Sequence, residues 1–479
     1  MKKGVFSEYI LPMMIHKRTP AAILLLLCAA GLSLGVSGCA SQAESSEGSI
    51  EKPLPEEDEL YSGVAYSLSM GDPEQAIRAL EEAQKRDPDS LEAKQLLADV
   101  FLLVQQFDEA RAQLEEILRK DPDNQKALYS LSLIESAAGK TNEQKKILDR
   151  LLKINPQNDS AQAAMGEIFL REKKYADAEK IFTQSLDKNP DNLVALIGLG
   201  NTQLRQGKAE EAATTLTQAI ERQPDYPFAY TDRSKAHVGK GDLEEAEADL
   251  TKAIGLIPDF AWNYYDRGKL RANSGSTAAA LEDLNKALEM DPGISLAYFY
   301  RARIYDGMEN IEAAYADYRK AQSMNPQYPY LNLPLAILEY KKENWTQAAA
   351  CFIRAAEIEK DEHAYHLLAA LCYKKAGNEK QAFDYLGKVL GRLPRESLFY
   401  HMARYYMQPS SDLFIMQQVT VEKNKILRAR MLFYIAAQYT LQNRIPPAMK
   451  YFMEAAGEET RGYIENRIAE WDLKKIGGK

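Results

Sequence analysis

Residues 261–294 read AWNYYDRGKLRANSGSTAAALEDLNKALEMDPGI, and their pattern recurs along most of the chain. Gly268 is small, Ala280 is small, and the large apolar Leu284 precedes Pro292 by eight residues. Prolines recur on one 34-residue grid, so the chain carries an internal repeat of fixed period. The grid holds Pro88, Pro122, Pro156, Pro190, Pro224, Pro258, Pro292, Pro326 and Pro394, and its one slot without proline is Lys360.

The other positions of the repeat predict a pair of closely packed helices. An alanine stands twelve residues before the proline slot in nine units of ten, with Gln144 as the exception. Small residues let two helix axes approach, and the large residue fills the gap between them. Glycines such as Gly71 stand where the first helix must end. In the same turn we expect Asp72 to cap the second helix and Pro73 to begin it. Each second helix should stop at the residue before its proline.

The repeat resembles the tetratricopeptide-repeat (TPR) family over residues 57–396, as ten units of 34 residues. Residues 397–428 form a shorter, degenerate unit, 429–462 a further unit, and 463–479 a closing helix and tail. The resemblance implies an all-α fold, a TPR α-solenoid of about twelve helix–turn–helix units in a right-handed superhelix. It also implies a concave groove lined by the first helices. Such arrays hold partners, so we expect no enzyme.

The N-terminus has the order of a secretory signal. Basic residues precede a short apolar run at 21–36, which is too short for a membrane-spanning helix. The following Val36-Ser37-Gly38-Cys39 resembles a bacterial lipobox. That resemblance implies a signal peptide over 1–38, cleavage between Gly38 and Cys39, and lipidation of Cys39. Residues 39–56 would then be the lipidated end and a flexible tether. The alternative is an ordinary signal peptide that contains a cysteine.

Localisation follows from these signals. We expect a lipid-anchored protein of the bacterial cell envelope, in the outer membrane and facing the periplasm. Its only membrane attachment would be the lipid. The formal net charge of −9 at pH 7 argues against nucleic acid as a partner.

Catalytic and metal-binding patterns are missing from the sequence. There is no P-loop and no HExxH motif. His363 and His366 lack a clear third ligand for zinc, so we expect no metal and no cofactor. Cys351 and Cys372 stand in successive units, as a disulfide or as two buried thiols.

Aromatic residues at positions 2 and 5 of the first helices mark a candidate partner groove. In the family these positions face the concave side, and aromatic rings often dominate binding. The candidates are Phe228, Trp262, Tyr265, Phe299 and Tyr330. The alternative is that the rings pack against one another.

A second pattern places an arginine sixteen residues before an aspartate in three successive units. We interpret it as a repeated ion pair between the two helices of a unit. The alternative is an arginine ladder for anionic ligands. The pairs are Arg233 with Asp249, Arg267 with Asp283, and Arg301 with Asp317.

Two functions remain open. The first is a non-enzymatic scaffold or adaptor that binds proteins or peptides of the cell envelope in its groove. The C-terminal part, with Phe399-Tyr400 and Phe433-Tyr434, is loosely similar to NlpI-type outer-membrane TPR adaptors. The second is a ligand-binding or partner subunit of an envelope transport system that holds a small hydrophobic molecule.

Overall fold

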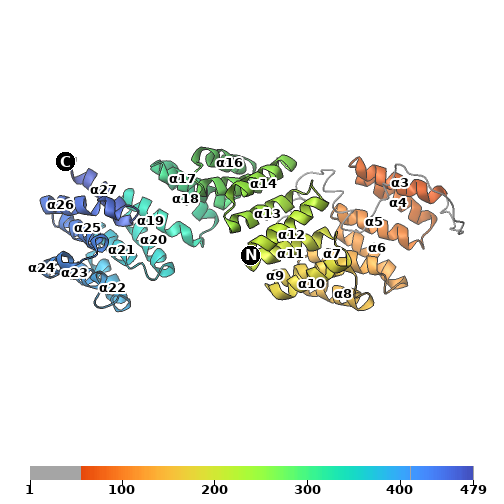
Figure 1. The fold of residues 1–479 in the computed structure, drawn as a ribbon, viewed down its shortest axis with the longest axis horizontal. Helices are drawn as coiled ribbons and strands as arrows, with labels where there is room; N and C mark the ends of the chain where they lie inside the picture. The colour runs from red at the N-terminus through yellow and green to blue at the C-terminus, as the bar shows by residue number, and fades with distance from the viewer. Residues whose placement is uncertain (1–54, 410–411, 478–479) are drawn as a thin grey trace. The chain divides into compact units, whose positions relative to one another are not determined.

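A computed structural model describes residues 55–409 and 412–477 (Figure 1). All regular elements in these two ranges are helices, and the α-helices follow one another as packed antiparallel pairs. The expected all-α TPR fold is confirmed. The chain divides into two compact units between Pro258 and Asp259. The predicted signal peptide 1–38, its cleavage site and the lipidation site Cys39 lie outside the described residues, as does the tether up to residue 54.

The first unit consists of six hairpins, in which the odd-numbered helix comes first. First helices of neighbouring hairpins also contact one another, for example α9 with α11 and α11 with α13. The helices are α3 (Pro55–Ser69), α4 (Pro73–Arg86), α5 (Leu91–Leu103), α6 (Phe107–Lys120), α7 (Gln125–Ala137), α8 (Thr141–Ile154), α9 (Asp159–Arg171), α10 (Tyr175–Lys188), α11 (Leu193–Arg205), α12 (Ala209–Arg222), α13 (Pro227–Lys240) and α14 (Leu243–Leu256).

The second unit continues the pairs and ends with a single helix. Its helices are α15 (Ala261–Asn273), α16 (Thr277–Met290), α17 (Ser295–Gly307), α18 (Ile311–Met324), η2 (Pro329–Leu331), α19 (Asn332–Lys341), α20 (Trp345–Ile358), α21 (Ala364–Lys375), α22 (Glu379–Val389), η3 (Leu390–Arg392), α23 (Leu398–Met407), α24 (Asp412–Val421), α25 (Lys425–Leu441), α26 (Ile445–Ala455), η5 (Glu458–Thr460) and α27 (Ile464–Gly477).

The turns form as the sequence predicts. Gly71 adopts a left-handed φ of 73°, and the Asp72 side chain accepts a hydrogen bond from the backbone N–H of Gln75 at 3.0 Å. Pro73 occupies the first turn of α4. At the other end Asp87 is extended, and α4 stops there because the next residue is Pro88. A left-handed residue returns at the same place in the other turns, as glycine at Gly139 and Gly207 but as Gln105 and Lys173 elsewhere, so the repeats share the turn conformation rather than its residues.

Small residues bring the helices together, and the fourth and fifth hairpins show how closely. The large slot of the fourth hairpin holds Phe182, where most units hold leucine, and its ring is fully buried. A Cβ atom on Gly166 would lie 2.6 Å from this ring, and one on Gly198 would lie closer still. The ring therefore fits only because glycine stands at both positions.

The two cysteines of the repeats are free, buried thiols. Burial raises the pKa of both the Cys351 and the Cys372 thiol, which keeps them protonated and unreactive. The thiol alternative is thus confirmed. None of the described helices has the length and apolar character needed to cross a membrane.

Candidate partner-binding surface

A continuous series of aromatic rings runs across α15, α17 and the segment that leads into η2. Each ring meets the next edge to face, which is a favourable arrangement for aromatic pairs. The centroid distances are 5.5 Å for Trp262–Tyr265, 6.1 Å for Tyr265–Tyr300, 5.4 Å for Tyr300–Phe299, 5.2 Å for Phe299–Tyr328 and 5.5 Å for Tyr328–Tyr330. We call these six residues the aromatic ladder.

The two ends of the ladder are exposed, and Tyr300 and Tyr328 are half-buried. Trp262 is 38% exposed and Tyr330 is 65% exposed, whereas Tyr265 is only 4% exposed and Phe299 only 7%. In the first unit Phe228 is also buried, against Tyr226 at 5.6 Å. The expectation of exposed rings is therefore corrected for these three residues. They pack against neighbouring aromatics, because rings at positions outside the predicted set cover them.

Two cations approach the middle of the ladder from different helices. The Lys269 ammonium lies 5.9 Å from the Tyr300 ring centroid, and the Arg303 guanidinium lies 5.4 Å from it. Arg303 also lies 6.0 Å from the Phe299 ring and donates a long hydrogen bond of 3.4 Å to Asn273. Neither cation has a carboxylate within ion-pair distance among the described residues. The result is an apolar surface with positive charge at its centre.

The repeated arginines are structural. Arg233, Arg267 and Arg301 each donate two hydrogen bonds to the aspartate sixteen residues later, at 2.7–2.9 Å. Arg301 also reaches Asn285 of the preceding hairpin at 2.7 Å, and Arg233 reaches Thr217 at 3.0 Å. The ion-pair interpretation is confirmed, and Arg233 and Arg301 also join successive hairpins.

The corresponding part of the first unit is polar rather than aromatic. Asp232 accepts hydrogen bonds from Asn201 at 2.9 Å and from Lys235 at 2.7 Å. Burial raises the pKa of Glu167 to about 7 against the opposing effect of Arg171. This face therefore carries compensated charges and a carboxyl group that resists ionisation.

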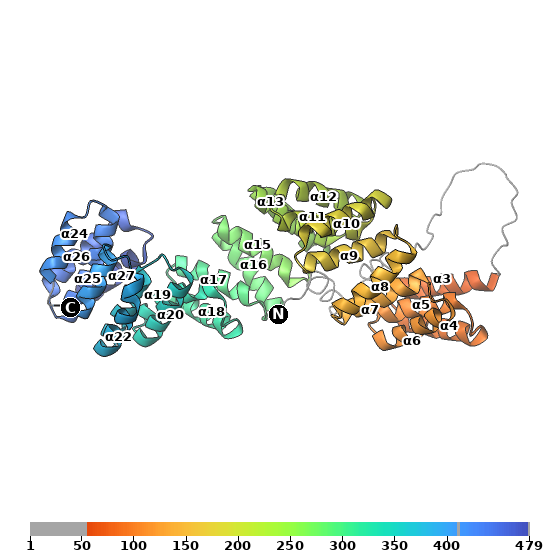
Figure 2. The same cartoon turned by 90° about the horizontal axis from the view of Figure 1, so that it is seen from below.

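The last helix contacts far more than the last hairpin. We expected the C-terminal residues to form a closing helix, and α27 does pack on α26. It also lies beside α19 and α25, as Figures 1 and 2 both show. Arg467 forms two hydrogen bonds with Asp306 of α17, at 2.5 and 3.0 Å. Helix α27 therefore covers the side formed by first helices α17, α19 and α21.

The centre of this contact is a Trp-Asp pair on α27. Two cations lie over the Trp471 ring, each 4.7 Å from its centroid: Lys341 of α19 and Arg467 of α27 itself. Asp472 is buried and accepts hydrogen bonds from the Tyr340 hydroxyl at 2.8 Å and from Lys375 at 2.9 Å. The array thus binds an aromatic ring and the adjacent carboxylate of its own chain with rings and cations.

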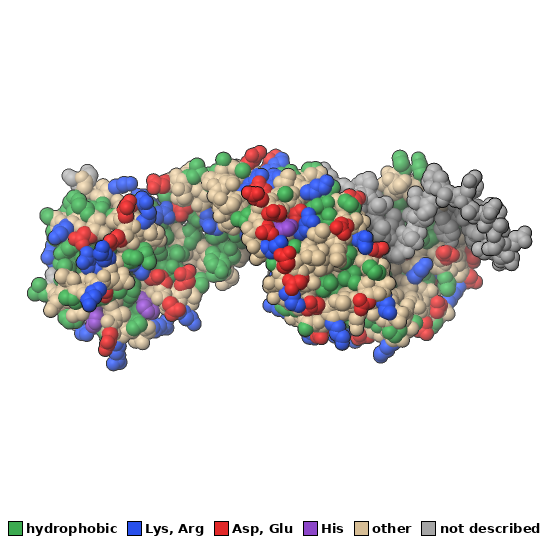
Figure 3. All heavy atoms as spheres, in the orientation of Figure 1, with side chains coloured by type: hydrophobic (Ala, Val, Ile, Leu, Met, Phe, Trp, Pro, Cys, Tyr) green, Lys and Arg blue, Asp and Glu red, His purple; other side chains and the backbone are tan. Residues whose placement is uncertain are grey.

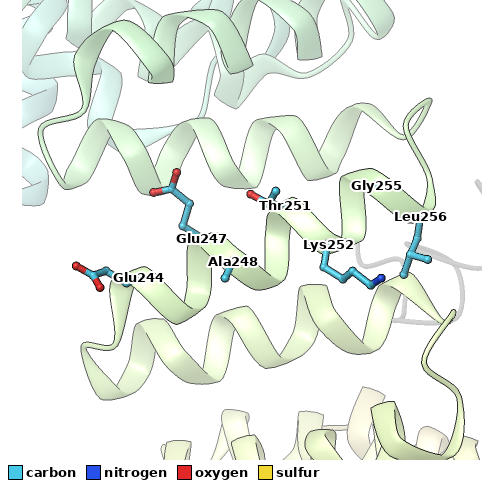
Figure 4. Close-up of a pocket in the computed structure, with 7 residues that line it drawn as sticks. All are labelled: Glu244, Glu247, Ala248, Thr251, Lys252, Gly255 and Leu256. Atoms are coloured by element: carbon cyan, nitrogen blue, oxygen red, sulfur yellow. The ribbon is translucent and has the colours of Figure 1, made fainter.

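The first unit has a shallow hollow along α14 (Figure 4). Its lining is mixed, with charged and small side chains and no aromatic ring: Glu244, Glu247, Ala248, Thr251, Lys252, Gly255 and Leu256. On the face drawn in Figure 3, basic and acidic side chains intersperse rather than form a patch of one sign.

The histidines do not form a metal site in the part of the chain that the structure describes. His366 is hydrogen-bonded to the Tyr385 hydroxyl at 2.7 Å, and His363 lies against the Phe399 ring. Burial lowers the pKa of His366 to about 4. No cluster of three or more potential metal ligands occurs among the described residues.

The sequence analysis did not identify several residues of the aromatic ladder and its surroundings. Tyr300, Tyr328, Lys269 and Arg303 lie outside the two helix positions that we considered. A signal for the cations was present, because position 9 of three successive first helices is basic: Lys235, Lys269 and Arg303.

Comparisons with known proteins agree with the repeat. Residues 42–247 match the family described as tetratricopeptide repeat protein 21 N-terminal ARM repeat, and residues 265–329 match a family described as tetratricopeptide repeat. No curated protein matches the chain. Both family matches and the paired helices support a TPR protein. TPR repeats suggest a scaffold for protein or peptide partners, generally without catalysis.

Solved structures that resemble the chain are shorter than it. PilF of Pseudomonas aeruginosa is 18% identical, and the match covers 44% of this chain and 96% of that one, with a TM-score of 0.40. A tetratricopeptide repeat protein from Parabacteroides merdae is 20% identical. This match covers 52% of this chain and 98% of that one, also with a TM-score of 0.40. A thermophilic TPR protein from Thermus thermophilus is 27% identical. This match covers 38% of this chain and 98% of that one, with a TM-score of 0.33.

Proposed function

We propose that this chain is a non-enzymatic scaffold of the bacterial cell envelope. It binds a protein or peptide segment at the aromatic ladder, and a lipid on Cys39 holds it at the membrane. The observation that carries the proposal is the exposure of Trp262 and Tyr330 at the ends of a packed series of rings. Exposed aromatic surface on a rigid support is typical of binding hot spots, because little side-chain entropy is lost on binding.

The envelope part of the proposal rests on the order of the N-terminal signals. Basic residues, the apolar run and the small residues before Cys39 follow one another as in a lipoprotein precursor. The outer membrane, facing the periplasm, is the proposed location. Each buried CH₂ of the acyl chains would contribute about 0.8 kcal/mol to anchoring.

The test uses the full chain expressed in a bacterium. Crosslinking in cells, purification from detergent-solubilised membranes and mass spectrometry identify the bound proteins. We expect the double variant Trp262→Ala/Tyr330→Ala to lose specific partners. The matched control is Phe383→Ala, which removes an equally exposed ring from α22, away from the ladder. Equal capture by both variants would reject the ladder as the binding surface.

The anchor is tested separately with Cys39→Ala. We expect this variant to move from the membrane fraction to the soluble fraction, because the lipid is its only proposed attachment. Mass spectrometry of the purified protein should find acyl chains on Cys39 in the wild type. A variant that stays fully membrane-bound would contradict the anchor.

A further inference from the structure

We infer that the aromatic ladder recognises a segment in which an aromatic side chain stands beside a carboxylate. This inference rests on the proposed function and specifies the chemistry of the partner. It begins from the contact that the second unit makes with its own α27, because that contact shows what such a surface binds.

The Trp-Asp pair of α27 is a bound example of this chemistry. The Lys341 ammonium of α19 lies 4.7 Å from the Trp471 ring centroid, Arg467 of α27 itself lies equally near, and Asp472 is satisfied by a tyrosine hydroxyl and a lysine. The lysine, Lys375, also lies 4.8 Å from the Tyr340 ring and 5.0 Å from the Trp345 ring. Rings and cations are therefore interleaved, so that one surface satisfies both the apolar and the acidic side chain.

The ladder repeats these components without an occupant from the described chain. Lys269 and Arg303 both lie over Tyr300, so one ring of the ladder has a cation from each of two helices. Near them, Asp266 is close enough to Tyr265 to help raise the pKa of its hydroxyl, after burial as the main cause. The acidic group of a ligand is placed at Arg303, because Arg303 is the more exposed of the two cations. Its aromatic group then packs against an exposed end of the ladder, Trp262 or Tyr330.

Charge complementarity selects this occupant over a purely apolar segment. Lys269 is partly buried and Arg303 is exposed, and each would lose water on contact with a ligand. An apolar segment would cover the charges without compensation, which is unfavourable. A carboxylate compensates them, and its hydrogen bonds to a guanidinium are stronger than neutral ones.

The ladder and the α27 contact share one helix. α17 carries Arg303 and, one turn later, Asp306, which Arg467 of α27 holds. The ladder, on α15, α17 and the η2 segment, therefore lies beside the contact that α27 makes with α17.

The experiment measures binding of a labelled synthetic peptide, SEEWDESG, to the purified full chain in detergent by fluorescence anisotropy. The matched peptide SQQWNQSG keeps the ring and replaces the carboxylates with amides. We expect the amide peptide to bind at least about tenfold more weakly, since hydrogen bonds to charged groups contribute about 1.5–3 kcal/mol. Added salt should weaken binding of the acidic peptide only.

Variants assign the effect to the ladder. Arg303→Gln and Lys269→Gln should each weaken binding of SEEWDESG about tenfold by the same reasoning, and Arg303→Lys should retain part of it. Arg395→Gln removes an exposed arginine from a distant loop and should leave binding unchanged. Equal affinity for both peptides, or no effect of Arg303→Gln, would overturn the inference.

The outcomes separate this inference from the proposed function. Suppose that Trp262→Ala/Tyr330→Ala abolishes partner capture in cells while SEEWDESG and SQQWNQSG bind alike. The scaffold function then stands, and the aromatic–acidic specificity is wrong. If capture in cells does not depend on the ladder but SEEWDESG still needs Arg303, the ladder is a peptide site and the proposed function fails.

Discussion

The hairpins of the first unit and the C-terminal part of the second unit are held together in different ways. In the first unit, alanine, glycine and leucine at fixed slots make contacts between adjacent helices. In the second unit, α27 connects residues far apart in the sequence: Arg467 bonds a residue 161 positions away, and Asp472 bonds one 132 positions away.

This difference predicts how the stability of each region should respond to a substitution. Stability of a simple repeat array is a sum of terms from single repeats and their neighbouring interfaces. A change in the first unit should therefore act locally. In the second unit Asp472 of α27 joins α19 and α21, so its loss should loosen these two first helices together with α27.

The largest effect is expected for Asp472→Ala. The substitution leaves Lys375 and the Tyr340 hydroxyl without their carboxylate in a buried place. Removing one partner of a buried ion pair costs about 3–5 kcal/mol. Hydrogen exchange followed by mass spectrometry should show faster exchange in α19, α21 and α27, with no change in α9.

The control for this variant lies on the same helix. Lys475 pairs with Glu343 at the surface, and both side chains are about half exposed. We expect Lys475→Gln to cost about 0–1 kcal/mol, as for other surface pairs. Equal protection of α19 in Asp472→Ala and in the wild type would refute the idea of a jointly held region.

A smaller and strictly local effect is expected for Gly198→Ala. The new Cβ would overlap the Phe182 ring, and overpacking a core costs about 1–3 kcal/mol. Phe182→Leu should restore much of the loss, because leucine is the usual residue of this slot. Urea unfolding of the four chains of this double-mutant cycle gives the coupling energy. Purely additive effects would show that the ring does not require the glycine.

The smallest effect is a dependence on pH that differs between the regions. In the first unit, burial raises the pKa of Glu167 from its ordinary 4.5 to about 7. Between these values the folded state keeps a proton that the unfolded state releases, so the free energy of unfolding falls as pH rises from 4.5 to 7. Glu167→Gln should remove this slope, measured by urea unfolding across that range. The control Glu179→Gln should shift stability uniformly there, because its ion pair with Lys208 lowers the pKa of Glu179.

His366 gives the second unit the opposite response. Its pKa is lowered from 6.5 to about 4, so the unfolded state binds a proton that the folded state does not. Stability from this group is full above pH 6.5 and is lost as the pH falls toward 4. The protection of α21 amides, which is the ratio of their intrinsic exchange rate to the observed rate at the same pH, should therefore fall on acidification, and His366→Asn should weaken that fall. An unchanged fall in the variant would exclude His366 as its cause.

The repeat was predictable because its determinants are local. Gly71, Asp72 and Pro73 define a turn within three residues, and the same left-handed backbone recurs every 34 residues at Gln105, Gly139, Lys173 and Gly207. The position of α27 was not predictable in this way. Its partners, Asp306 and Tyr340, are more than a hundred residues away in the sequence. The periodicity of a helix indicates which of its faces is apolar, but it does not indicate which distant helices that face will contact.

The candidate surface was predictable only in part, for a steric reason. Trp262 and Tyr330 are exposed as expected, because no later ring covers them. Tyr265 and Phe299 are buried by Tyr300 and Tyr328. The sequence analysis considered only positions 2 and 5 of each first helix, and Tyr300 and Tyr328 stand at neither. Aromatic residues in neighbouring units compete for the same space, and a per-unit pattern does not record that competition.

The return of α27 onto earlier helices restricts where such an array can grow by duplication. A 34-residue hairpin inserted ahead of α17 would leave Asp306, Tyr340 and Lys375 at their places beside α27. The same insertion between α17 and α25 would carry Asp306 away from Arg467. The chain is therefore free to lengthen on its N-terminal side, while the spacing from α17 to its end is fixed.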